Sequence, residues 1–377
     1  MKIAFDGKRA MRNFTGLGNY SRGLIAQLCQ QAPQNEYLLF APEGNEGNER
    51  IQQFLKEAPL LRCLYAEGAK RYIKPLWRSW LVSKEINDRG VDIYHGLSGE
   101  LPLNIGRYPR IKSVVTIHDL IFERFPQFYH RIDRYIYTYK MKKACETADR
   151  VIAVSQCTKR DIMSLYGIPE EKIDVVYQGC DPAFTASASA ETMQEVKARY
   201  NLEEGYILYV GTIEERKNAL LAVKAMKEVK DRTLVLAGRA TPYSRQLWQA
   251  AEEMGIRERI RMLHDVPFSL LPALYQMAAA FVYPSRYEGF GIPILEALNS
   301  NVPVVACTGS CLEEAGGPDS LYVHPDDVRE MAQAVNSILE NPDLRRMMTE
   351  KGLKWAERFS KEHHANGILQ VYDTICK

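Results

Sequence analysis

Short apolar runs, rich in β-branched and aromatic residues, alternate with longer helical stretches along almost the whole chain. The runs are continuously apolar, and this pattern is typical of strands that are buried on both faces. Strands that alternate with helices favour βαβ units and parallel sheets. We expect six strands in each half of the chain, at residues 2–5, 37–41, 92–95, 113–117, 151–154 and 173–177, and then at 206–210, 233–237, 260–263, 280–283, 302–306 and 321–323.

The length of the chain and a change in its composition indicate two domains. A chain of 377 residues suits two cores of middling size better than one. Turn-forming residues at 177–182 precede an Ala/Ser-rich stretch at 183–190, which would pack poorly in a core. We therefore predict an α/β protein with two doubly wound, Rossmann-like parallel-sheet domains, at 1–183 and 184–359, whose sheets face one another across a cleft.

The charge distribution limits the classes of partner. Residues 1–180 carry 27 Lys and Arg against 20 Asp and Glu, so this half has a net charge of +7, within a whole-chain net charge of +2. A basic half can attract phosphates, nucleic acid or an anionic membrane. This excess of positive charge is small for a segment of 180 residues, and we expect no nucleic-acid partner.

Targeting and metal-binding patterns are missing from the sequence. No run reaches the roughly 20 apolar residues of a membrane span, and Asp6, Lys8 and Arg9 interrupt the apolar run near the N-terminus. The eight cysteines form no C-x-x-C pair, which disfavours zinc and indicates free thiols in a reducing compartment. We expect a cytoplasmic protein without a bound metal.

The densest candidate site is the stretch 287–297. Gly289 and Gly291 allow a ligand to approach the backbone closely, and a glycine loop that leads into a helix N-terminus is an anion site. Glu288 and Glu296 flank this loop, with Glu296 expected in the first turn of the helix, and carboxylates accept hydrogen bonds from sugar hydroxyls. The pattern indicates a ligand with both phosphate and sugar parts; the alternative is that Glu296 only caps its own helix.

A second candidate site follows the strand expected at 206–210. Arg216 and Lys217 are expected to open the next helix, in the region where ligands of an open parallel sheet bind. Arg can hold phosphate oxygens with two donors, whereas Lys acts as a point charge. These two cations predict a diphosphate site, and the alternative is an ordinary solvated run of charges.

Two further candidates lie in the first half of the chain. Gly16 and Gly18 stand in the segment 16–20, between the first strand and the next helix. They do not complete the G-x-G-x-x-G fingerprint, and they also fit an ordinary flexible turn. His118 follows the strand expected at 113–117, where it could meet a ligand or be a buried structural histidine.

Taken together, these motifs resemble those of the group 1 (family 4) retaining glycosyltransferases over nearly the whole chain. Glu288 and Glu296 resemble the family's E-x7-E motif with its glycine–phenylalanine–glycine interior. The sequence segments 211–218 and 236–239 look most like those of bacterial mannosyltransferases. The similarity also covers the glycine loop 16–20, the histidine segment 116–120, the stretches 154–158 and 175–181, and the diphosphate clamp 210–218.

The resemblance implies a role for each candidate. Arg216 and Lys217 would neutralise the diphosphate leaving group. Glu288 would contact the transferred sugar, Glu296 the ribose, and His118 a sugar hydroxyl near the anomeric carbon. The residues that would hold phosphate, sugar or base, mostly through their backbone, are Gly16, Gly18, Val266, Gly289, Phe290, Gly291 and Ile292.

The resemblance also implies a fold and an activity. The fold would be GT-B, with a last helix at 360–377 that returns to the first domain. The activity would be transfer of a sugar, with retention, from a nucleotide diphosphate sugar to a glycan or lipid-linked acceptor in polysaccharide biosynthesis. GDP-mannose is the preferred donor, with GDP favoured over UDP, and no cofactor is expected. The segment 264–267, which would meet the base, departs from the glycine-led segment that the family often has.

Three other functions remain open. A GT-B sugar-nucleotide epimerase would turn over the nucleotide sugar without an acceptor, and a phosphorylase would require inorganic phosphate. A non-catalytic nucleotide-sugar binder or scaffold would show no turnover, although the intact set of two cations and two carboxylates speaks against it. The sequence does not identify the acceptor, the linkage or the oligomeric state.

Two segments mix basic and aromatic residues, at 70–80 and 129–143. Such segments can lie on anionic lipid and admit a lipid-linked acceptor. They would allow peripheral contact with the inner face of the membrane, but the pattern favours the alternative of an ordinary surface helix on the acceptor side.

Overall fold

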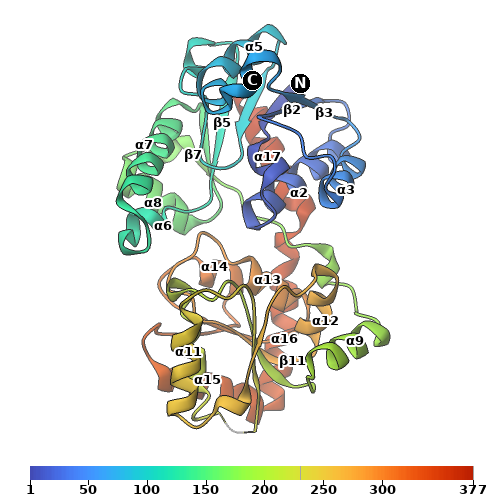
Figure 1. Cartoon of the computed structure of the whole chain (residues 1–377), viewed down its shortest axis with the longest axis vertical. Helices are drawn as coiled ribbons and strands as arrows, with labels where there is room; N and C mark the ends of the chain where they lie inside the picture. Colours follow the sequence, from blue (N-terminus) through green and yellow to red (C-terminus); the bar gives the residue numbers. More distant parts are fainter. Residues whose placement is uncertain (230, 377) are drawn as a thin grey trace. The chain divides into compact units, whose positions relative to one another are not determined.

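The computed structural model describes residues 1–229 and 231–376, and its backbone divides into two compact units. The first unit comprises Met1–Gly179 together with the last helix, and the second comprises Cys180–Ser360. Figure 1 shows in each unit a sheet covered by helices. The prediction of two parallel-sheet α/β domains is confirmed.

Among the described residues, the first unit contains a seven-stranded parallel sheet, one strand more than predicted. The strand that the sequence prediction missed is β3 (Leu61–Tyr65), at the edge of the sheet. It carries Arg62 and its side chains are only partly buried, so it lacks the continuous apolar run of an interior strand. The other strands are β1 (Lys2–Asp6), β2 (Glu36–Ala41), β4 (Ile93–Gly96), β5 (Lys112–Ile117), β6 (Arg150–Ala153) and β7 (Ile173–Val175), and the order is β3-β2-β1-β4-β5-β6-β7.

Successive residues of the central strands pack on opposite faces of this sheet. Ile3 and Phe5 of β1 belong to one hydrophobic cluster, and Ala4 belongs to another. Burial of both faces explains why the strands are continuously apolar in sequence. The first cluster includes side chains from α2 (Gly16–Gln31), α3 (Glu49–Glu57) and α17 (Lys361–Cys376). The second cluster includes side chains from α5 (Val82–Asp88), α7 (Arg131–Thr147) and α8 (Gln156–Tyr166).

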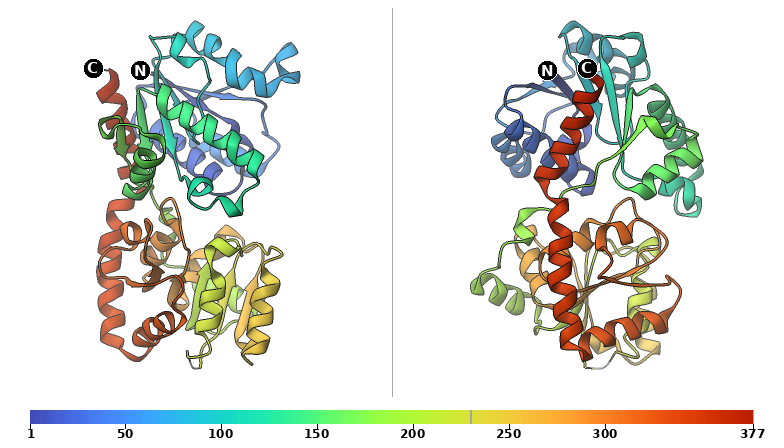
Figure 2. Two further views of the ribbon diagram at one scale, coloured as in Figure 1. Left: turned by 90° about the vertical axis from the view of Figure 1, so that its left-hand side faces the viewer. Right: turned by 180° about the vertical axis from the view of Figure 1, so that it is seen from behind.

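The last helix, α17, packs against α2 and is part of the first unit (Figure 2). The hydroxyl of its Tyr372 lies 2.6 Å from Nδ1 of His95 on β4, and both side chains are buried. This is the helix that the resemblance assigns to the first domain, although it comes last in the chain.

The division between the units differs by a few residues from the boundaries 183/184 and 359/360 that the sequence suggested. Cys180 forms a backbone bridge with Ser360, and Phe184 packs its ring against Tyr275. The stretch that starts at Cys180 therefore joins the second unit, and the first unit ends at Gly179.

Within the described residues, the second unit contains a six-stranded parallel sheet. The strand order reverses between β8 (Tyr206–Val210) and β11 (Ala278–Tyr283). Such a switch point is where open parallel sheets bind ligands, beyond the carboxyl ends of the strands. The other strands are β9 (Leu234–Ala237), β10 (Ile260–Leu263), β12 (Val304–Cys307) and β13 (Leu321–Val323), and the order is β10-β9-β8-β11-β12-β13.

Further helices connect and cover these strands. None of the helices in the described part of the chain has both the length and the apolar character needed to span a membrane. These helices are α1 (Lys8–Arg12), α4 (Lys74–Leu76), α6 (Ile121–Arg124), α9 (Ala190–Tyr200), α10 (Ala219–Ala225), α11 (Ser244–Glu253), α12 (Leu271–Gln276), α13 (Ile292–Asn299), α14 (Leu312–Gly316), α15 (Val328–Glu340) and α16 (Pro342–Ala356).

Two glycines of α2 differ in their surroundings. A Cβ atom on Gly18 would lie 1.7 Å from the carbonyl oxygen of Asn13, whereas a Cβ atom on Gly23 would meet nothing within 4 Å. Only the first position therefore requires glycine for packing.

We expect Gly18→Ala to destabilise the first unit by about 1–3 kcal/mol, because the Asn13 carbonyl must move to admit the methyl group. The matched change Gly23→Ala should instead stabilise it by about 0.5–1 kcal/mol, since alanine is the better helix former. Urea unfolding followed by circular dichroism measures both changes. Equal stabilities of the two variants would contradict the close approach of Gly18 to Asn13.

Candidate active site

Two segments meet beyond the carboxyl ends of β8 and β11. After β8, Glu215–Lys217 form the short 3-10 helix η7, and Asn218, at φ +54°, connects η7 to α10. Arg216 and Lys217 therefore lie in a separate turn, and the prediction that they open the next helix is wrong because the left-handed Asn218 after them separates their turn from α10. The backbone N–H of Arg286, after β11, donates to the carbonyl of Arg216 at 3.0 Å and joins the two segments.

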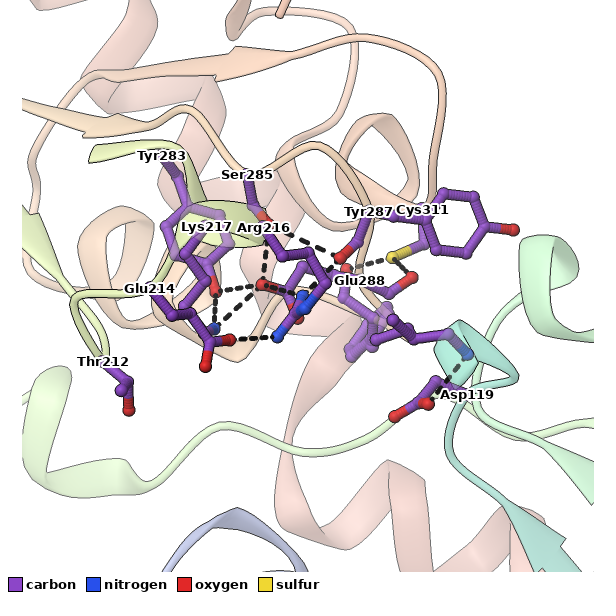
Figure 3. Close-up of polar contacts among 12 residues, drawn as sticks. Asp119, Thr212, Glu214, Arg216, Lys217, Tyr283, Ser285, Tyr287, Glu288 and Cys311 are labelled. Atoms are coloured by element: carbon purple, nitrogen blue, oxygen red, sulfur yellow. Dashed lines mark hydrogen bonds and ion pairs between the residues drawn. The ribbon is translucent and has the colours of Figure 1, made fainter. Parts of the chain in front are cut away.

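The Glu288 carboxylate is the centre of this site (Figure 3). Its Oε1 accepts a hydrogen bond from Lys217 Nζ at 2.9 Å and lies 3.1 Å from Nη1 of Arg216. The hydroxyls of Tyr283 and Ser285 also donate to Oε1, at 3.0 Å and 2.8 Å. Two cations and two hydroxyls thus converge on one carboxylate oxygen, and the structure brings together three residues that the sequence singled out in separate motifs.

Glu288 stays ionised although it is largely buried. Its side chain and that of Arg216 are each 13% exposed, and that of Lys217 is 16% exposed. Burial alone would raise the pKa of Glu288, but the charges of Lys217 and Arg216, with hydrogen bonds from Lys217 and Ser285, lower it to about 2. The carboxylate is therefore charged throughout the neutral pH range and holds both cations in place.

Each cation has further partners. Nη1 of Arg216 donates to the carbonyl of Tyr287 at 2.5 Å, and Nη2 donates to the carboxylate of Glu214 at 2.7 Å. Nζ of Lys217 donates to the hydroxyl of Tyr283 at 2.9 Å and lies 5.4 Å from the centre of that ring. Glu214 is 39% exposed, and exposed ion pairs are weak, so this carboxylate can leave Arg216 when another anion arrives.

The loop after Glu288 leads into helix α13. Gly291, at φ +136°, precedes the helix with a backbone angle that favours glycine. The thiol of Cys311 lies 3.1 Å from the carbonyl oxygen of Glu288 and 2.6 Å from that of Phe290, and it holds the loop in place. The side chain of Phe290 is buried. The four predicted backbone contacts Gly289, Phe290, Gly291 and Ile292 lie in this loop and at the first position of α13, and the N-terminus of a helix suits an anion.

Glu296 lies in the middle of α13, so the prediction that it stands in the first turn is wrong. The helix begins only at Ile292, and Gly291 is its cap, so Glu296 does not cap its own helix either. Its Oε2 accepts a hydrogen bond from the Tyr275 hydroxyl at 2.8 Å. Burial raises the pKa of Glu296 to about 7, although this hydrogen bond acts in the opposite direction.

Gly16 and Gly18 lie in the first turn of α2 and not in a loop before it, which corrects the sequence prediction. The N–H of Gly18 donates to the side-chain oxygen of Asn13 at 3.1 Å, so this end of the helix is tied to the preceding turn. A Cβ atom on Gly16 would meet nothing within 4 Å. Gly18 therefore has a packing role, and Gly16 stands in open space at the start of the helix.

His118 follows β5 and is half-buried. Its Nε2 lies 2.9 Å from the carbonyl oxygen of Leu97 and must carry a proton to bond with it, while Nδ1 lies 3.3 Å from the side-chain amide nitrogen of Gln178. Burial lowers the pKa of His118 to about 4, so the ring is neutral at pH 7. In this state the ring can serve a ligand only as an acceptor, through Nδ1, where a ligand donor would replace the amide of Gln178.

A partly buried aromatic cluster sets the orientation of His118. The ring of Tyr20, from α2, meets it edge-on with the centroids 4.4 Å apart, and the ring of His364, from α17, lies 5.1 Å from Tyr20. The hydroxyl of Tyr20 lies 3.4 Å from Oγ1 of Thr116, which in turn lies 2.8 Å from Nε2 of His95. These contacts are those of a structural histidine, and they fix the orientation of the ring.

Val266 lies half-buried in the segment between β10 and the short helix η9 (Phe268–Leu270). Asp265 before it has φ +52°, and Nδ1 of His264 lies 3.0 Å from the carbonyl oxygen of Gly238, after β9. This segment is thus beyond the carboxyl end of β10, which is separated from the switch point by β9 and β8. Val266 therefore lies at the same edge of the second sheet as Arg216, Lys217 and Glu288.

Sequence reasoning assigned no role in the site to Tyr283, Ser285, Tyr275 or Cys311. A signal existed for the first two, because Tyr283 ends a buried strand and Ser285 follows it, at the edge where ligands bind. Tyr275 and Cys311 lie 21 and 23 residues from their partners, and nothing in the sequence links them. Across the described residues, no three or more His, Cys, Asp or Glu side chains gather as a metal site would require.

Both units match known families. Residues 14–184 match the model of Glycosyltransferase Family 4, and residues 191–355 match that of Glycosyl transferases group 1. The chain is 32% identical to O-antigen chain mannosyltransferase B of Escherichia coli, and the match covers 100% of each protein. It is 30% identical to O-antigen chain mannosyltransferase RfbU of Salmonella typhimurium, over 61% of this chain and 62% of that protein.

Solved structures share the fold. Anabaena HepE in complex with UDP and glucose superposes with a TM-score of 0.78 at 18% identity, covering 99% of this chain and 100% of that one. A glycosyltransferase from Rickettsia africae superposes with a TM-score of 0.78 at 18% identity, covering 100% of this chain and 98% of that one. The family models, the full-length relative and the two parallel sheets agree, and the chain belongs to the group 1 (family 4) glycosyltransferases of GT-B fold, similar to bacterial mannosyltransferases.

Proposed function

We propose that the enzyme transfers mannose from GDP-mannose to a glycan or lipid-linked acceptor in polysaccharide biosynthesis. Both relatives described above are named O-antigen chain mannosyltransferases, which supports this sugar and this kind of product. The observation that carries the proposal is the convergence of Arg216 and Lys217 on Glu288 at the switch point of the second sheet. Two oriented cations at this place suit the diphosphate of a nucleotide sugar.

The two cations would stabilise the leaving group. Breaking the bond between the anomeric carbon and the diphosphate places negative charge on the departing oxygen, and Arg216 and Lys217 would take up this charge. Glu214 and Glu288 neutralise them while no ligand is bound. The exposed Glu214 can give way to the diphosphate, whereas Glu288 stays and keeps both cations oriented. Charges that are already in place need no reorganisation during the reaction.

We propose retention of the anomeric configuration without a covalent enzyme intermediate. Oε1 of Glu288 already faces four donor groups, which makes this carboxylate a poor nucleophile. Instead, the acceptor hydroxyl would attack from the face that the diphosphate leaves. The bond from the anomeric carbon to the acceptor oxygen forms as the bond to the phosphate oxygen breaks, and the hydroxyl proton passes to that phosphate oxygen. NMR of the product anomer tests this, and an inverted product would contradict it.

The remaining candidates would bind the donor. The backbone N–H groups of residues 289–292 would hold phosphate or sugar oxygens at the start of α13. Glu296 would accept hydrogen bonds from the ribose hydroxyls, and the backbone of Val266 would meet the base. In the first unit, Gly16 would let the substrate approach α2 closely, and Nδ1 of His118 would accept a hydrogen bond from a sugar hydroxyl.

We expect Lys217→Ala to keep its fold but to lose roughly 10²–10³ in kcat, because one preorganised charge partner contributes about 3–4 kcal/mol to the transition state. Lys224→Ala is the matched control, since it removes an exposed cation of the neighbouring helix α10, and it should retain full activity. Release of the nucleoside diphosphate measures turnover, and circular dichroism checks the fold. Turnover like that of the parent enzyme in Lys217→Ala would contradict the clamp.

The raised pKa of Glu296, about 7, predicts that donor binding depends on pH. Ribose hydroxyls bind the ionised carboxylate better than the protonated one, so affinity should rise as pH increases towards about 7 and level off above it. Below pH 7 the Kd should grow by up to about tenfold per pH unit. Calorimetric titration of the nucleotide between pH 5.5 and 8.5 measures the change. Glu296→Gln serves as control for ionisation of the nucleotide itself, and the same profile in both proteins would exclude Glu296 as the ribose ligand.

The donor can be identified directly. Thermal-shift screening against GDP, UDP, ADP, dTDP and their sugars should show the largest stabilisation with GDP and GDP-mannose, since a ligand that binds only the folded state raises Tm. Stabilisation by UDP sugars alone would overturn the donor assignment. Turnover without an acceptor would favour an epimerase, a requirement for inorganic phosphate would favour a phosphorylase, and binding without turnover would favour a scaffold.

A cytoplasmic location and peripheral contact with the inner face of the membrane complete the proposal. A nucleotide sugar is a cytoplasmic donor, and a lipid-linked acceptor would lie at the membrane surface. The basic and aromatic segments at 70–80 and 129–143 support such contact through the first unit.

A further inference from the structure

Three histidines of the first unit have little contact with water. His95 on β4 and His364 on α17 are buried, and His118 after β5 is half-buried. Burial lowers the pKa of His95 and of His364 to about 3, so both rings are neutral, as that of His118 is. Only His118 has a role in the proposed function. A neutral buried ring can contribute packing and hydrogen bonds of fixed direction, and the other two histidines contribute one of these each.

A chain of hydrogen bonds leads from the last helix to Tyr20. Within the part of the chain that the structure describes, the buried Tyr372 hydroxyl has one hydrogen-bond partner, Nδ1 of His95 at 2.6 Å, so it donates to this nitrogen. The single proton of the neutral His95 ring is then on Nε2, which donates to Oγ1 of Thr116 at 2.8 Å. The Thr116 hydroxyl is left to donate to the Tyr20 hydroxyl, 3.4 Å away. The direction of each bond therefore follows from Tyr372 on α17.

The ring of Tyr20 contacts two imidazoles. The planes of Tyr20 and His118 are perpendicular, with the centroids 4.4 Å apart, and the ring of His364 is tilted by 45° at 5.1 Å. Tyr20 comes from α2 and His364 from the start of α17, and these two helices pack against each other (Figure 1). Ring pairs at such separations favour edge-on and tilted arrangements, so each ring limits the orientations of its neighbour. His364 thus supports Tyr20, and Tyr20 supports His118.

His364 supports Tyr20 by its shape and not by a hydrogen bond. The residue is 7% exposed, and among the described residues its buried Nε2 has no hydrogen-bond partner. A buried nitrogen without a partner destabilises the folded state, so hydrogen bonding does not account for a histidine at this place. Its ring contact with Tyr20 does, because a flat ring of this size fills the space beside the phenol.

The ring contact restrains Tyr20 more than the hydroxyl contact does. The 3.4 Å between the Tyr20 and Thr116 oxygens is long for an O–H···O hydrogen bond, which usually measures about 2.7–2.8 Å. The bond at the hydroxyl is therefore weak. Substitutions that keep an aromatic ring at Tyr20 or His364 should accordingly preserve most of the support, and substitutions that remove the ring should not.

We propose that Tyr20 and His364 are positioning residues for His118, and that the last helix thereby supports the part of the site that meets the sugar. His364 backs Tyr20, and Tyr20 keeps the imidazole in the orientation in which Nε2 donates to the Leu97 carbonyl and Nδ1 is left as an acceptor. Neither positioning residue touches the substrate. The effect on turnover rests on the proposed role of His118 in binding a sugar hydroxyl, whereas the positioning itself does not.

Steady-state kinetics of the full chain with GDP-mannose test the effect on the reaction. His364→Ala should lower kcat/KM about tenfold, because a misplaced group beside the reacting sugar slows turnover. His364→Phe should stay within about twofold of the parent, since a phenyl ring packs against Tyr20 in place of the imidazole. The matched control is Val371→Ala, which truncates another buried side chain of α17 that takes no part in the ring contacts. It should lower Tm and leave kcat/KM unchanged. Affinity for GDP, which lacks the transferred sugar, should be the same in all these variants.

Substitutions of Tyr20 test the same support if His364→Ala does not fold. Tyr20→Phe removes the long hydroxyl contact and keeps the ring, so kcat/KM should fall by no more than about threefold. Tyr20→Leu removes the ring and should lower kcat/KM about tenfold.

NMR of the histidine side chains detects the position of His118 without any turnover. In a chain labelled with ¹⁵N and ¹³C histidine, His118→Gln identifies the imidazole signals of this residue. These signals should shift in His364→Ala and in Tyr20→Leu, because the neighbouring Tyr20 ring moves or is lost. They should stay close to those of the parent in His364→Phe and in Val371→Ala.

Two outcomes would overturn the positioning proposal. One is that His364→Ala and Val371→Ala change kcat/KM and the His118 signals to the same extent. The other is a loss in His364→Phe as large as that in His364→Ala, because the ring nitrogens and not the ring would then be needed. The proposed function fails separately: shifted His118 signals with an unchanged kcat/KM would support the positioning and contradict a role of His118 in sugar binding. If the parent does not turn over GDP-mannose, the donor assignment is wrong, and the NMR comparison still decides the positioning.

Discussion

The pairing of one buried carboxylate with two cations fixes the arrangement of the segments that follow β8 and β11 in the second unit. Arg216 and Lys217 are neighbours in a tight turn, and their positive charges would repel each other without Glu288 between them. The same carboxylate joins the segments after β8 and β11, which are far apart in sequence. Removing Glu288 would leave both cations without this partner and with little access to water, which is strongly destabilising, whereas removing Lys217 leaves Glu288 paired with Arg216. The protein's own charges therefore hold this cluster together.

The alternation of apolar runs and helices was enough to predict the two parallel sheets, because strands covered on both faces have a distinctive pattern. It missed β3, whose edge position leaves its side chains partly exposed. The identity of Arg216, Lys217 and Glu288 was also predictable from local motifs. Their contact was not, since Lys217 and Glu288 are 71 residues apart and meet only because β8 and β11 are neighbours in the sheet. Strand order is a property of the whole domain that no local pattern contains.

The two glutamates of the E-x7-E motif show that a local motif does not determine the pKa of its side chains either. Glu288 faces cations and hydroxyls, which hold its pKa at about 2, whereas Glu296 faces the Tyr275 hydroxyl inside the unit and has a pKa of about 7. Two identical side chains in one motif thus differ in charge near neutral pH, and environments that separate such values commonly mark separate roles. The position of Glu296 in the middle of α13 produces this difference, and the sequence prediction placed it one turn too early.

The first unit shows why a count of charges is a poor guide to a binding surface. Several cations of the basic stretch 68–82 point inward or pair locally: Lys70 binds Glu85, Lys74 binds Glu43, and Arg78 binds Asp6 and Glu100. These pairs offset part of the positive charge of the segment and tie η1 (Gly68–Tyr72), α4 and η2 (Trp77–Leu81) to neighbouring elements. What faces outward is a set of aromatic and aliphatic side chains with a few cations such as Arg71 and Lys142. The inward pairs give those apolar groups a rigid support, so that they can remain exposed without collapsing onto the core.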